Sequence, residues 1–317
     1  MKKALTILTL LLVLVMTTAS LAAAPDFNNK NVTFICPWDA GGSSDAISRQ
    51  IAELFAKMTG ARTAVENRGG AGGTIATTEF KAAPADGTSI CLEAIGVFTL
   101  QPFVREVQYS IDDFIPVVAL SEEPIVMLAH KNADISSVED LKAKDSVLYG
   151  FSGAGSLMEL SQKKLLKDLG VDAVGIPYDG SSSALSAVLG EHVDVIVTHP
   201  GESLQYIESG DLKAVGVFNA ERMVGATLED IPTFKEQGYD TTMSVWKFFI
   251  VPKATDPAIV DYLVETLNAC TSSPEYLEFC EKLQLQPLTL TPEQMIERIN
   301  NEAEVNKLLL EADKPAA

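Results

Sequence analysis

The chain repeats one local pattern, in which a short apolar strand leads through a turn rich in glycine and serine into an amphipathic helix. Its first copy is the strand 32–36, the turn 37–44 and the helix 45–58, whose apolar residues recur at helical spacing. The run 193–198 is almost continuously apolar, as expected of a strand covered on both faces. Strands alternating with helices predict an α/β fold in which helices flank mainly parallel sheets. The same pattern predicts further strands at 63–66, 89–94, 114–120, 124–129, 147–151, 173–178, 212–218 and 245–251, and a short helix after Pro232.

The length of the chain predicts two lobes, because 317 residues exceed the usual size of a single domain. No low-complexity linker separates two halves, so we expect the chain to cross between the lobes more than once. The first lobe is predicted to comprise residues 25–124 and 230–317, and the second residues 125–229. The crossings are expected near 124–129 and 212–219.

The N-terminus has the pattern of an export signal. Lys2 and Lys3 precede the apolar run 5–15, and small residues then lead to Pro25. The run is short for a bilayer span and no basic stop-transfer cluster follows it, so we predict a cleaved signal peptide at 1–24 rather than a membrane anchor. No cysteine lies at the cleavage site to carry a lipid. The mature protein is therefore expected to be periplasmic, without direct membrane insertion.

The chain is strongly acidic, with 24 basic residues, 43 acidic residues and a formal net charge of −19. Loss of residues 1–24 would leave 22 basic residues and a charge of −21. Such a surface repels nucleic acid and anionic membranes, so neither is expected as a partner. Salt screens this repulsion beyond about 8 Å, so aimed local donors can still bind an anion.

The four cysteines are Cys36, Cys91, Cys270 and Cys280. Export permits disulfides, and Cys270 and Cys280 flank a break between two helical stretches, which is compatible with a local bridge. Cys36 and Cys91 lie in apolar strand patterns that are typical of small core residues. Spacing leaves both pairings open, and none of the four cysteines fits a zinc or redox motif.

Three turns, at 40–44, 69–74 and 152–156, share the path from a strand end through Gly and Ser into a helix. The first N–H groups of a helix lack internal partners and carry partial positive charge, so such turns form anion sites without Lys or Arg. One helix start contributes about 0.3–2 kcal/mol to anion binding, whereas a micromolar site needs about 8 kcal/mol. Any one turn is most simply ordinary turn chemistry, but three in one exported chain favour a carboxylate cleft shared by two closing lobes.

Motifs for cofactors, metals and catalysis are missing from the sequence. There is no Gly-Lys pair for a phosphate-binding loop, no dinucleotide spacing of glycines and no hydrolase elbow at 150–154. The histidines, His130, His192 and His199, lack metal-ligand spacing. No cofactor and no metal are therefore expected. His199 follows the strand 193–198 and could reach a cleft, although a polar loop residue is the simpler interpretation.

Arg68 could clamp a ligand carboxylate with two parallel hydrogen bonds. Pairing with Glu66 or Asp45 explains it at least as well.

Several ordered motifs carry a resemblance to a known family. They are Pro-Trp-Asp-Ala-Gly-Gly-Ser-Ser-Asp at 37–45, Val-Glu-Asn-Arg-Gly-Gly-Ala-Gly-Gly at 65–73, Ala-Pro-Ala-Asp-Gly at 83–87, Tyr-Gly-Phe-Ser-Gly-Ala-Gly-Ser at 149–156, Ile-Pro-Tyr-Asp-Gly at 176–180, Leu-Gly-Glu-His-Val-Asp at 189–194 and Asp-Ile-Pro-Thr-Phe at 230–234. The set covers essentially the whole mature chain and resembles the tripartite tricarboxylate transporter receptors, the TctC/Bug family.

The resemblance implies a two-lobed periplasmic binding protein of the Venus flytrap kind, similar to type II binding proteins. It implies that a small di- or tricarboxylate or related organic acid is captured without catalysis and delivered to membrane transporter subunits by a monomeric receptor. It also implies that backbone N–H groups, hydroxyls and water hold the ligand. Together with the turns above, it predicts the ligand-binding residues Trp38, Ala40, Gly41, Gly42, Ser43, Asp45, Gly72, Gly73, Thr74, Ser152, Gly153, Ala154, Gly155, Ser156, Tyr178, Ser181, Thr198, His199 and Trp246.

Two positions depart from the family pattern, and both concern the ligand more than the fold. His199 stands where Asn is frequent, and Gly69-Gly70 stands where Arg-Pro-Gly is usual. Two other functions stay open at this point. One is an exported hydrolase that uses a serine with His199, and the other is a sensor that presents its ligand to a membrane kinase.

Overall fold

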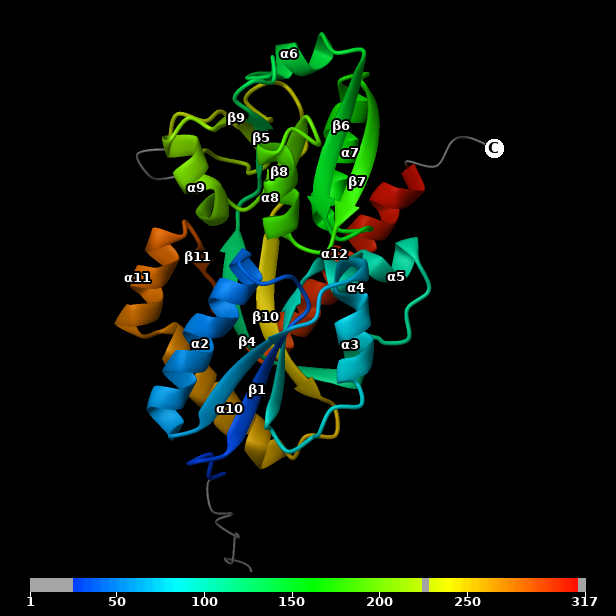
Figure 1. Cartoon of the computed structure of the whole chain (residues 1–317). Coiled ribbons are helices and arrows are strands. Elements are labelled where there is room, and N and C mark those ends of the chain that lie inside the picture. Colours follow the sequence, from blue (N-terminus) through cyan, green and yellow to red (C-terminus); the bar gives the residue numbers. More distant parts are fainter. Residues whose placement is uncertain (1–24, 224–227, 313–317) are drawn as a thin grey trace, which may run out of the picture.

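The computed structural model describes residues 25–223 and 228–312, so the predicted signal peptide at 1–24 lies outside the described residues. Two lobes lie one above the other, each with a sheet flanked by helices (Figure 1). The predicted two-lobed α/β fold is therefore confirmed.

The sheet of the first lobe has the strand order β11-β4-β10-β3-β1-β2. β1, β2 and β3 pair in parallel, and β10 runs antiparallel to both β3 and β4. The strands are β1 (Asn31–Cys36), β2 (Arg62–Asn67), β3 (Ser89–Ala94), β4 (Phe114–Glu123), β10 (Val245–Pro252) and β11 (Gln286–Pro287).

Helices cover this sheet because each has one apolar face. In α2 (Ser43–Thr59), the side chains of Ile47, Ile51 and Phe55 are fully buried, and Gly60 ends the helix in the left-handed conformation. The other helical segments of the lobe are η1 (Ala71–Gly73), α3 (Thr74–Phe80), α4 (Gly96–Thr99), α5 (Gln101–Val104), η2 (Ile111–Asp113), α10 (Pro257–Thr271), α11 (Pro274–Lys282) and α12 (Pro292–Ala312).

The sheet of the second lobe has the order β7-β6-β8-β5-β9. Its strands are β5 (Val126–His130), β6 (Ser146–Ser152), β7 (Asp172–Tyr178), β8 (Val195–Thr198) and β9 (Leu212–Val217). Its helices are α6 (Val138–Lys142), α7 (Leu157–Asp168), α8 (Ser181–Leu189) and α9 (Pro200–Glu208). All four residues of β8 are buried, as its apolar sequence predicts.

Both sheets are mixed, which corrects the prediction of mainly parallel sheets. β5 runs antiparallel to β8 and β9, just as β10 runs antiparallel to its two neighbours. The reason is the connection between the lobes. The chain enters each sheet at the edge that faces the other lobe, which is also the edge where the parallel strands end. A strand that begins at this edge runs away from it and is therefore antiparallel to its neighbours.

The chain passes between the lobes twice, from β4 to β5 and from β9 to β10. Phe218 N–H donates to the carbonyl oxygen of Ile125 at 2.9 Å, so the two connections lie side by side. The segment after β9 stays with the second lobe, because Phe234 N–H donates to Val217 O at 2.9 Å and Met243 N–H donates to Phe218 O at 2.7 Å. We therefore propose that the second lobe extends to about residue 244 rather than 229. Turns occupy the place of the helix predicted after Pro232, which was wrong.

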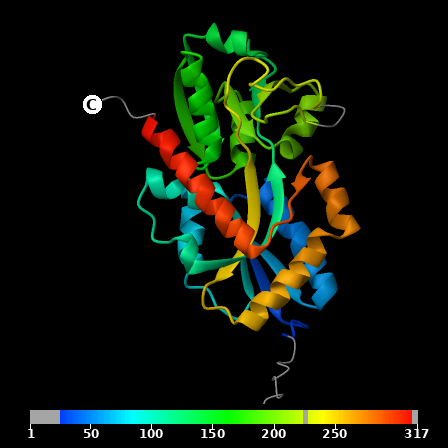
Figure 2. The ribbon, with the colours of Figure 1, turned by 180° about the vertical axis from the view of Figure 1, so that it is seen from behind.

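The C-terminal helix α12 crosses behind both lobes (Figure 2). Met295 and Ile299 are buried in a core shared by residues of the two sheets, and Asn306 Nδ2 donates to Thr99 Oγ1 at 3.1 Å. Toward its end, Leu309 lines a recess together with Leu160 of α7. α12 thus packs on the first lobe and reaches the second.

Candidate functional site

A cavity lies between the two lobes at the edge of the sheets where the parallel strands end. The space in which the centre of a water molecule fits amounts to about 50 Å³. The lining residues come from the strand-to-helix turns of both lobes and from β10. They are Trp38, Gly42, Ser43, Ser44, Gly72, Ala94, Gly96, Val97, Gln101, Ser152, Ser156, Leu157, Met158, Ser181, His199, Val245 and Lys247.

All three glycine- and serine-rich turns reach this cavity, through Ser43, Gly72 and Ser156 among others. The residues predicted from sequence that line it are Trp38, Gly42, Ser43, Gly72, Ser152, Ser156, Ser181 and His199. The lobes also touch here, because a Cβ on Gly153 would lie 2.5 Å from Gly72 Cα. The ligand-binding role of these residues stays a prediction.

The remaining predicted residues do not line the cavity. They are Ala40, Gly41, Asp45, Gly73, Thr74, Gly153, Ala154, Gly155, Tyr178, Thr198 and Trp246. Thr198 is fully buried, and Gly41 lines a second recess together with residues of α8. Tyr178, Thr198 and Trp246 are strand residues, and most of the others belong to the turns.

Trp246 lies on the opposite face of β10, which corrects its predicted place near the cleft. Its indole Nε1–H donates to Glu302 Oε1 at 3.1 Å, and the guanidinium of Arg298 lies 4.9 Å from the ring centroid. Side chains alternate along a strand, so the two neighbours of Trp246, Val245 and Lys247, face the cavity instead.

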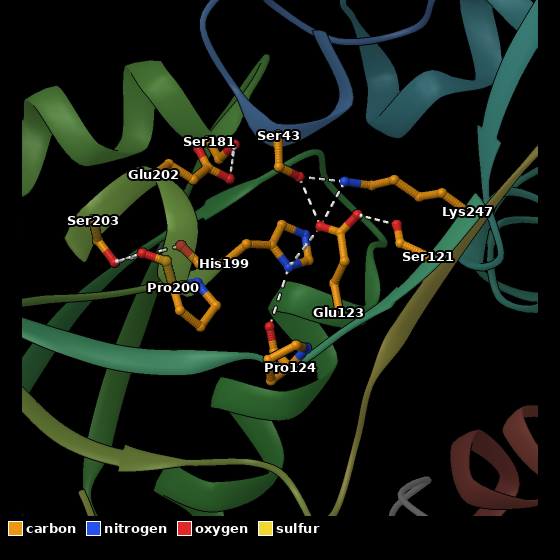
Figure 3. A network of polar contacts seen from close by, with 10 residues as sticks. All are labelled: Ser43, Ser121, Glu123, Pro124, Ser181, His199, Pro200, Glu202, Ser203 and Lys247. Carbon is orange, nitrogen blue, oxygen red and sulfur yellow. Dashed lines mark hydrogen bonds and ion pairs between the residues drawn. The ribbon is translucent and has the colours of Figure 1, made fainter. Parts of the chain in front are cut away.

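Lys247, a basic residue inside the cavity wall, was not among the residues predicted from sequence. Its side chain is only 2% exposed, and Nζ lies 2.8 Å from Glu123 Oε2 (Figure 3). Lys247 Nζ also donates to Ser43 Oγ. The signal was available, because a single lysine within an apolar strand is buried only when an acidic or polar partner satisfies it.

Glu123 is the centre of a buried polar network. Its carboxylate accepts hydrogen bonds from Ser43 Oγ at 2.7 Å and from Ser121 Oγ at 3.0 Å, besides the one from Lys247. Burial raises the pKa of Glu123, but the Lys247 ammonium and the hydrogen bonds from Lys247 and Ser43 outweigh burial and hold its pKa below the ordinary value. Glu123 is therefore ionised and fully paired.

His199 is neutral at physiological pH, because burial lowers its pKa to about 4. Its Nδ1 lies 3.1 Å from Glu123 Oε2 and 3.2 Å from Pro124 O. Both neighbours are acceptors, so Nδ1 carries the proton. Ser203 Oγ donates to backbone oxygens of His199 and Pro200, not to the imidazole ring. Within the described residues no serine hydroxyl is hydrogen-bonded to the ring, so this arrangement does not favour the hydrolase alternative.

Glu202 adds a second, half-buried carboxylate beside the cavity (Figure 3). Ser181 Oγ donates to its Oε1 at 2.8 Å, whereas Oε2 is buried without a partner. Burial raises the pKa of Glu202 to about 7. The backbone of Ser43, at the start of α2, counteracts part of this rise by favouring the ionised form of Glu202.

Acidic side chains of the chain itself already accept hydrogen bonds at two of the predicted anion-binding turns. Gly41 N–H donates to Asp45 Oδ2 at 3.0 Å, and Gly155 N–H donates to Glu159 Oε2 at 2.6 Å. These two N–H groups belong to the turn residues directly before the N-caps Gly42 and Ser156, and they are already paired. The positive ends of α2 and α7 are partly offset before a ligand arrives.

The chain is similar in sequence to proteins of a known family. A sequence model described as "TctC: Tripartite tricarboxylate transporter family receptor" matches residues 47–314. The chain belongs to this receptor family. The receptor is 29% identical over 303 residues to a UPF0065 protein from the TAR-I ttuE-ttuC' intergenic region of Agrobacterium vitis, with 92% of this chain and 87% of that protein covered. It is 28% identical over 292 residues to protein BugT of Bordetella pertussis, with 87% and 88% covered.

Solved structures agree with this family membership. The periplasmic binding protein BugD matches with a TM-score of 0.84 and 29% identity, over 89% of this chain and 97% of that one. The R. palustris protein Rpa4515 with adipate matches with a TM-score of 0.83 and 26% identity, over 88% and 96%. The family and the fold of the receptor are those of periplasmic solute-binding proteins.

The two lobes of the receptor are in contact around the cavity. Ser183 Oγ of the second lobe donates to Asp39 Oδ2 of the first at 3.0 Å. On the other side, Gln101 Nε2 and Arg105 Nη2 donate to Ala154 O at 2.9 Å and 2.5 Å. These bonds join segments far apart in sequence and hold the lobes in a closed arrangement.

Other residues considered in the sequence have structural partners. Arg68 pairs with Glu66 at 2.9 Å and with Glu79 at 3.1 Å, so the prediction of a pair with Glu66 is confirmed. All four cysteines, Cys36, Cys91, Cys270 and Cys280, are free and buried, and neither disulfide left open by the sequence is present.

The described part of the receptor has neither a metal-binding cluster nor a membrane-spanning helix. It contains no group of three or more Cys, His, Asp or Glu residues arranged to hold a metal ion. Within residues 25–223 and 228–312, no helix combines the length and the apolar character that crossing a membrane requires.

Proposed function

We propose that this receptor captures a small organic carboxylate in the cavity between its lobes and delivers it to a membrane transporter. The observation that carries the proposal is the buried ammonium of Lys247, which forms part of the cavity wall between two closed lobes. Family membership and the adipate complex of a protein 26% identical to this one support the same class of ligand.

Lys247 and a set of serine hydroxyls would hold the carboxylate. Ser44 and Ser152 line the cavity, and neither hydroxyl is hydrogen-bonded within the described part of the chain. Hydrogen bonds to a charged group contribute about 1.5–3 kcal/mol each, so three or four of them approach the roughly 8 kcal/mol of a micromolar site. Closure of the lobes would bring the donors of both lobes onto one ligand.

The cellular setting belongs to the same proposal. A cleaved signal at 1–24 would place the mature receptor in the periplasm, and membrane subunits of a tripartite transporter would be its protein partners. The receptor would act as a monomer, without a cofactor and without chemical change to its ligand.

Isothermal titration calorimetry against a panel of mono-, di- and tricarboxylates tests the proposal. The informative variant is Lys247→Met combined with Glu123→Gln, which removes the ammonium without leaving Glu123 charged and unpaired. The matched control is Lys253→Met, which removes an exposed lysine at the end of the same strand.

The expected result is binding of at least one acid by the wild type and by Lys253→Met, and a loss of about hundredfold in the double variant. Folded wild-type protein that binds no acid of the panel would contradict the proposal. Full binding by the double variant would exclude Lys247 as the recognition group.

A further inference from the structure

The charged groups around the cavity nearly cancel one another before any ligand enters. From this balance we infer that the ligand is a small monocarboxylate, with one ionised carboxylate on a short apolar body. The inference rests on the proposed function and names the class of acid that the site accepts.

Lys247 carries the single permanent positive charge among the described residues that line the cavity. That charge is matched by Glu123, whose Oε2 lies 2.8 Å from Nζ. The other basic candidate in the wall, His199, is neutral, because burial lowers its pKa to about 4. Its Nδ1–H faces the acceptors Glu123 and Pro124 O and is not available to a ligand. The charged part of the wall is therefore a neutral ion pair.

Acidic side chains in the first turns of α2 and α7 offset part of the positive charge of these helix starts. Asp45 accepts from Gly41 N–H at the start of α2, and Glu159 accepts from Gly155 N–H at the start of α7. Glu202 lies beside α2 as well and is held by Ser181. A ligand with two carboxylates would bring its second negative charge into a site where the positive ends of α2 and α7 already face acidic side chains.

One carboxylate, in contrast, finds donors in this wall. An ammonium has three donors, and Glu123 and Ser43 account for two of those of Lys247, which leaves one for a ligand. The hydroxyls of Ser44 and Ser152 lie in the same wall. These groups complete the hydrogen bonds of one carboxylate without requiring a further cation.

One side of the wall is apolar, apart from the polar residues Gln101, Ser156 and Ser181. Leu157 Cγ lies 3.3 Å from the position of a Cβ on Gly96, and Val97 and Trp38 both lie within 3.3 Å of the position of a Cβ on Gly73, so these side chains lie close to one another. Ala94, Met158 and Val245 extend this surface. Methylene groups gain free energy against such a wall, whereas a second carboxylate would lose its water there without gaining a partner.

The size of the cavity limits the length of the apolar body. A single water needs about 10–15 Å³ of space for its centre, so about 50 Å³ holds roughly four waters. This room suits an acid with a short chain. Longer acids would require the lobes to open further.

The test compares acids of similar size that differ in charge. Succinate and its monoamide, succinamate, have nearly the same shape, and butyrate has the same carbon chain with one carboxylate. Calorimetry of the wild-type receptor at pH 8 should give a Kd for butyrate and succinamate at least about tenfold lower than for succinate. Adipate and hexanoate form a second pair with the same expected order.

Glu202→Gln tests the electrostatic cause, with Glu221→Gln as a control at an exposed acid remote from the cavity wall. Removal of the negative charge beside α2 should improve the affinity for succinate relative to that for succinamate by about tenfold. The control should leave the ratio of the two Kd values unchanged. Succinate that binds as tightly as succinamate to the wild type would overturn the inference while leaving the proposed function intact. Failure of every acid to bind would overturn both.

Discussion

Lys247 Nζ and Glu123 Oε2 lie 2.8 Å apart on the two neighbouring strands, β10 and β4, that connect the lobes. Glu123 is the last residue of β4 before the chain enters the second lobe. The ion pair therefore lies at the hinge and in the cavity wall at once. Any change in its charge is expected to affect both stability and ligand binding.

Lys247→Met alone should lower the free energy of unfolding by about 3–5 kcal/mol, because it leaves Glu123 ionised, buried and unpaired. Adding Glu123→Gln should restore most of this loss, since the neutral amide can accept from one of Ser43 and Ser121 through its oxygen and donate to the hydroxyl of the other through its NH2 group. Urea unfolding of the wild type, both single variants and the double variant measures the coupling. Additive single effects would show that the pair contributes no coupling energy.

Ser156→Asp should abolish carboxylate binding while the helix it caps stays folded. Ser156 lines the cavity and accepts from Glu159 N–H at the start of α7, and Asp is an equally good N-cap. A fixed negative charge about 5 Å from the ligand costs about 3 kcal/mol at an effective dielectric constant near 20, or roughly hundredfold in affinity. Ser156→Asn is the neutral control and should bind within a few-fold of the wild type, as measured by calorimetry alongside thermal melts. Equal binding by both variants would remove this turn from the site.

Gly180→Ala should hinder closure of the lobes without unfolding either one. Gly180 has φ −160°, which alanine adopts without strain, but a Cβ there would lie 2.6 Å from Asp39 Cβ of the opposite lobe. Small-angle X-ray scattering with a bound acid should show a larger radius of gyration than for the wild type, with affinity reduced at least about tenfold. Ser186→Ala, on the exposed side of α8, is the control. Unchanged compaction and affinity would mean that the two lobes do not approach as closely as described.

Glu93→Gln should remove a loss of stability at alkaline pH. Glu93 is fully buried on β3, and burial raises its pKa to about 8, although Thr77 and Cys91 donate to it. The pKa of Glu93 is higher in the folded state than its value near 4.5 in the unfolded state. The contribution of protonated Glu93 to the free energy of unfolding is therefore complete below pH 4.5 and is lost as the pH rises toward 8. Between pH 6.5 and 8 the wild type should lose about 2 kcal/mol that Glu93→Gln does not lose.

Urea unfolding at several pH values between 6.5 and 8 tests the expected role of Glu93. Glu202→Gln is the comparison, because the pKa of Glu202 is raised only to about 7. The loss of stability that Glu202 causes is therefore complete at a lower pH than that caused by Glu93. Parallel curves for wild type and Glu93→Gln would disprove the role of Glu93.

The local elements of the fold were predictable from sequence, because they depend on neighbouring residues. The predicted strand 89–94 matches β3 at both ends, and the predicted strand 173–178 matches β7 to within one residue. The antiparallel direction of β5 and β10 was not predictable from local pattern, since it follows from where the chain enters each sheet. The helix expected after Pro232 failed for a similar reason, because that segment is held by hydrogen bonds to β9 and Phe218.

The site was predictable where glycine and serine mark strand-to-helix turns, as at Ser43 and Ser156. A lone lysine in an apolar strand indicates that a buried partner exists, but the identity of a partner that is distant in sequence was not predictable. Lys247 and Glu123 are 124 residues apart, and neither has a recognisable local motif. Trp246 was misplaced because the face of a strand residue depends on register, which sequence spacing alone did not fix.

The path of α12 across both lobes makes the end of this helix a natural place for a fluorescent reporter. Leu308 is 62% exposed, whereas the four native cysteines are buried, and burial raises the pKa of Cys36 and Cys280 to about 11 and that of Cys270 to about 12. A single thiol introduced as Leu308→Cys would therefore react with a dye ahead of the native thiols. Because that dye would sit beside the moving lobe while anchored to the other, its emission would follow ligand capture in real time.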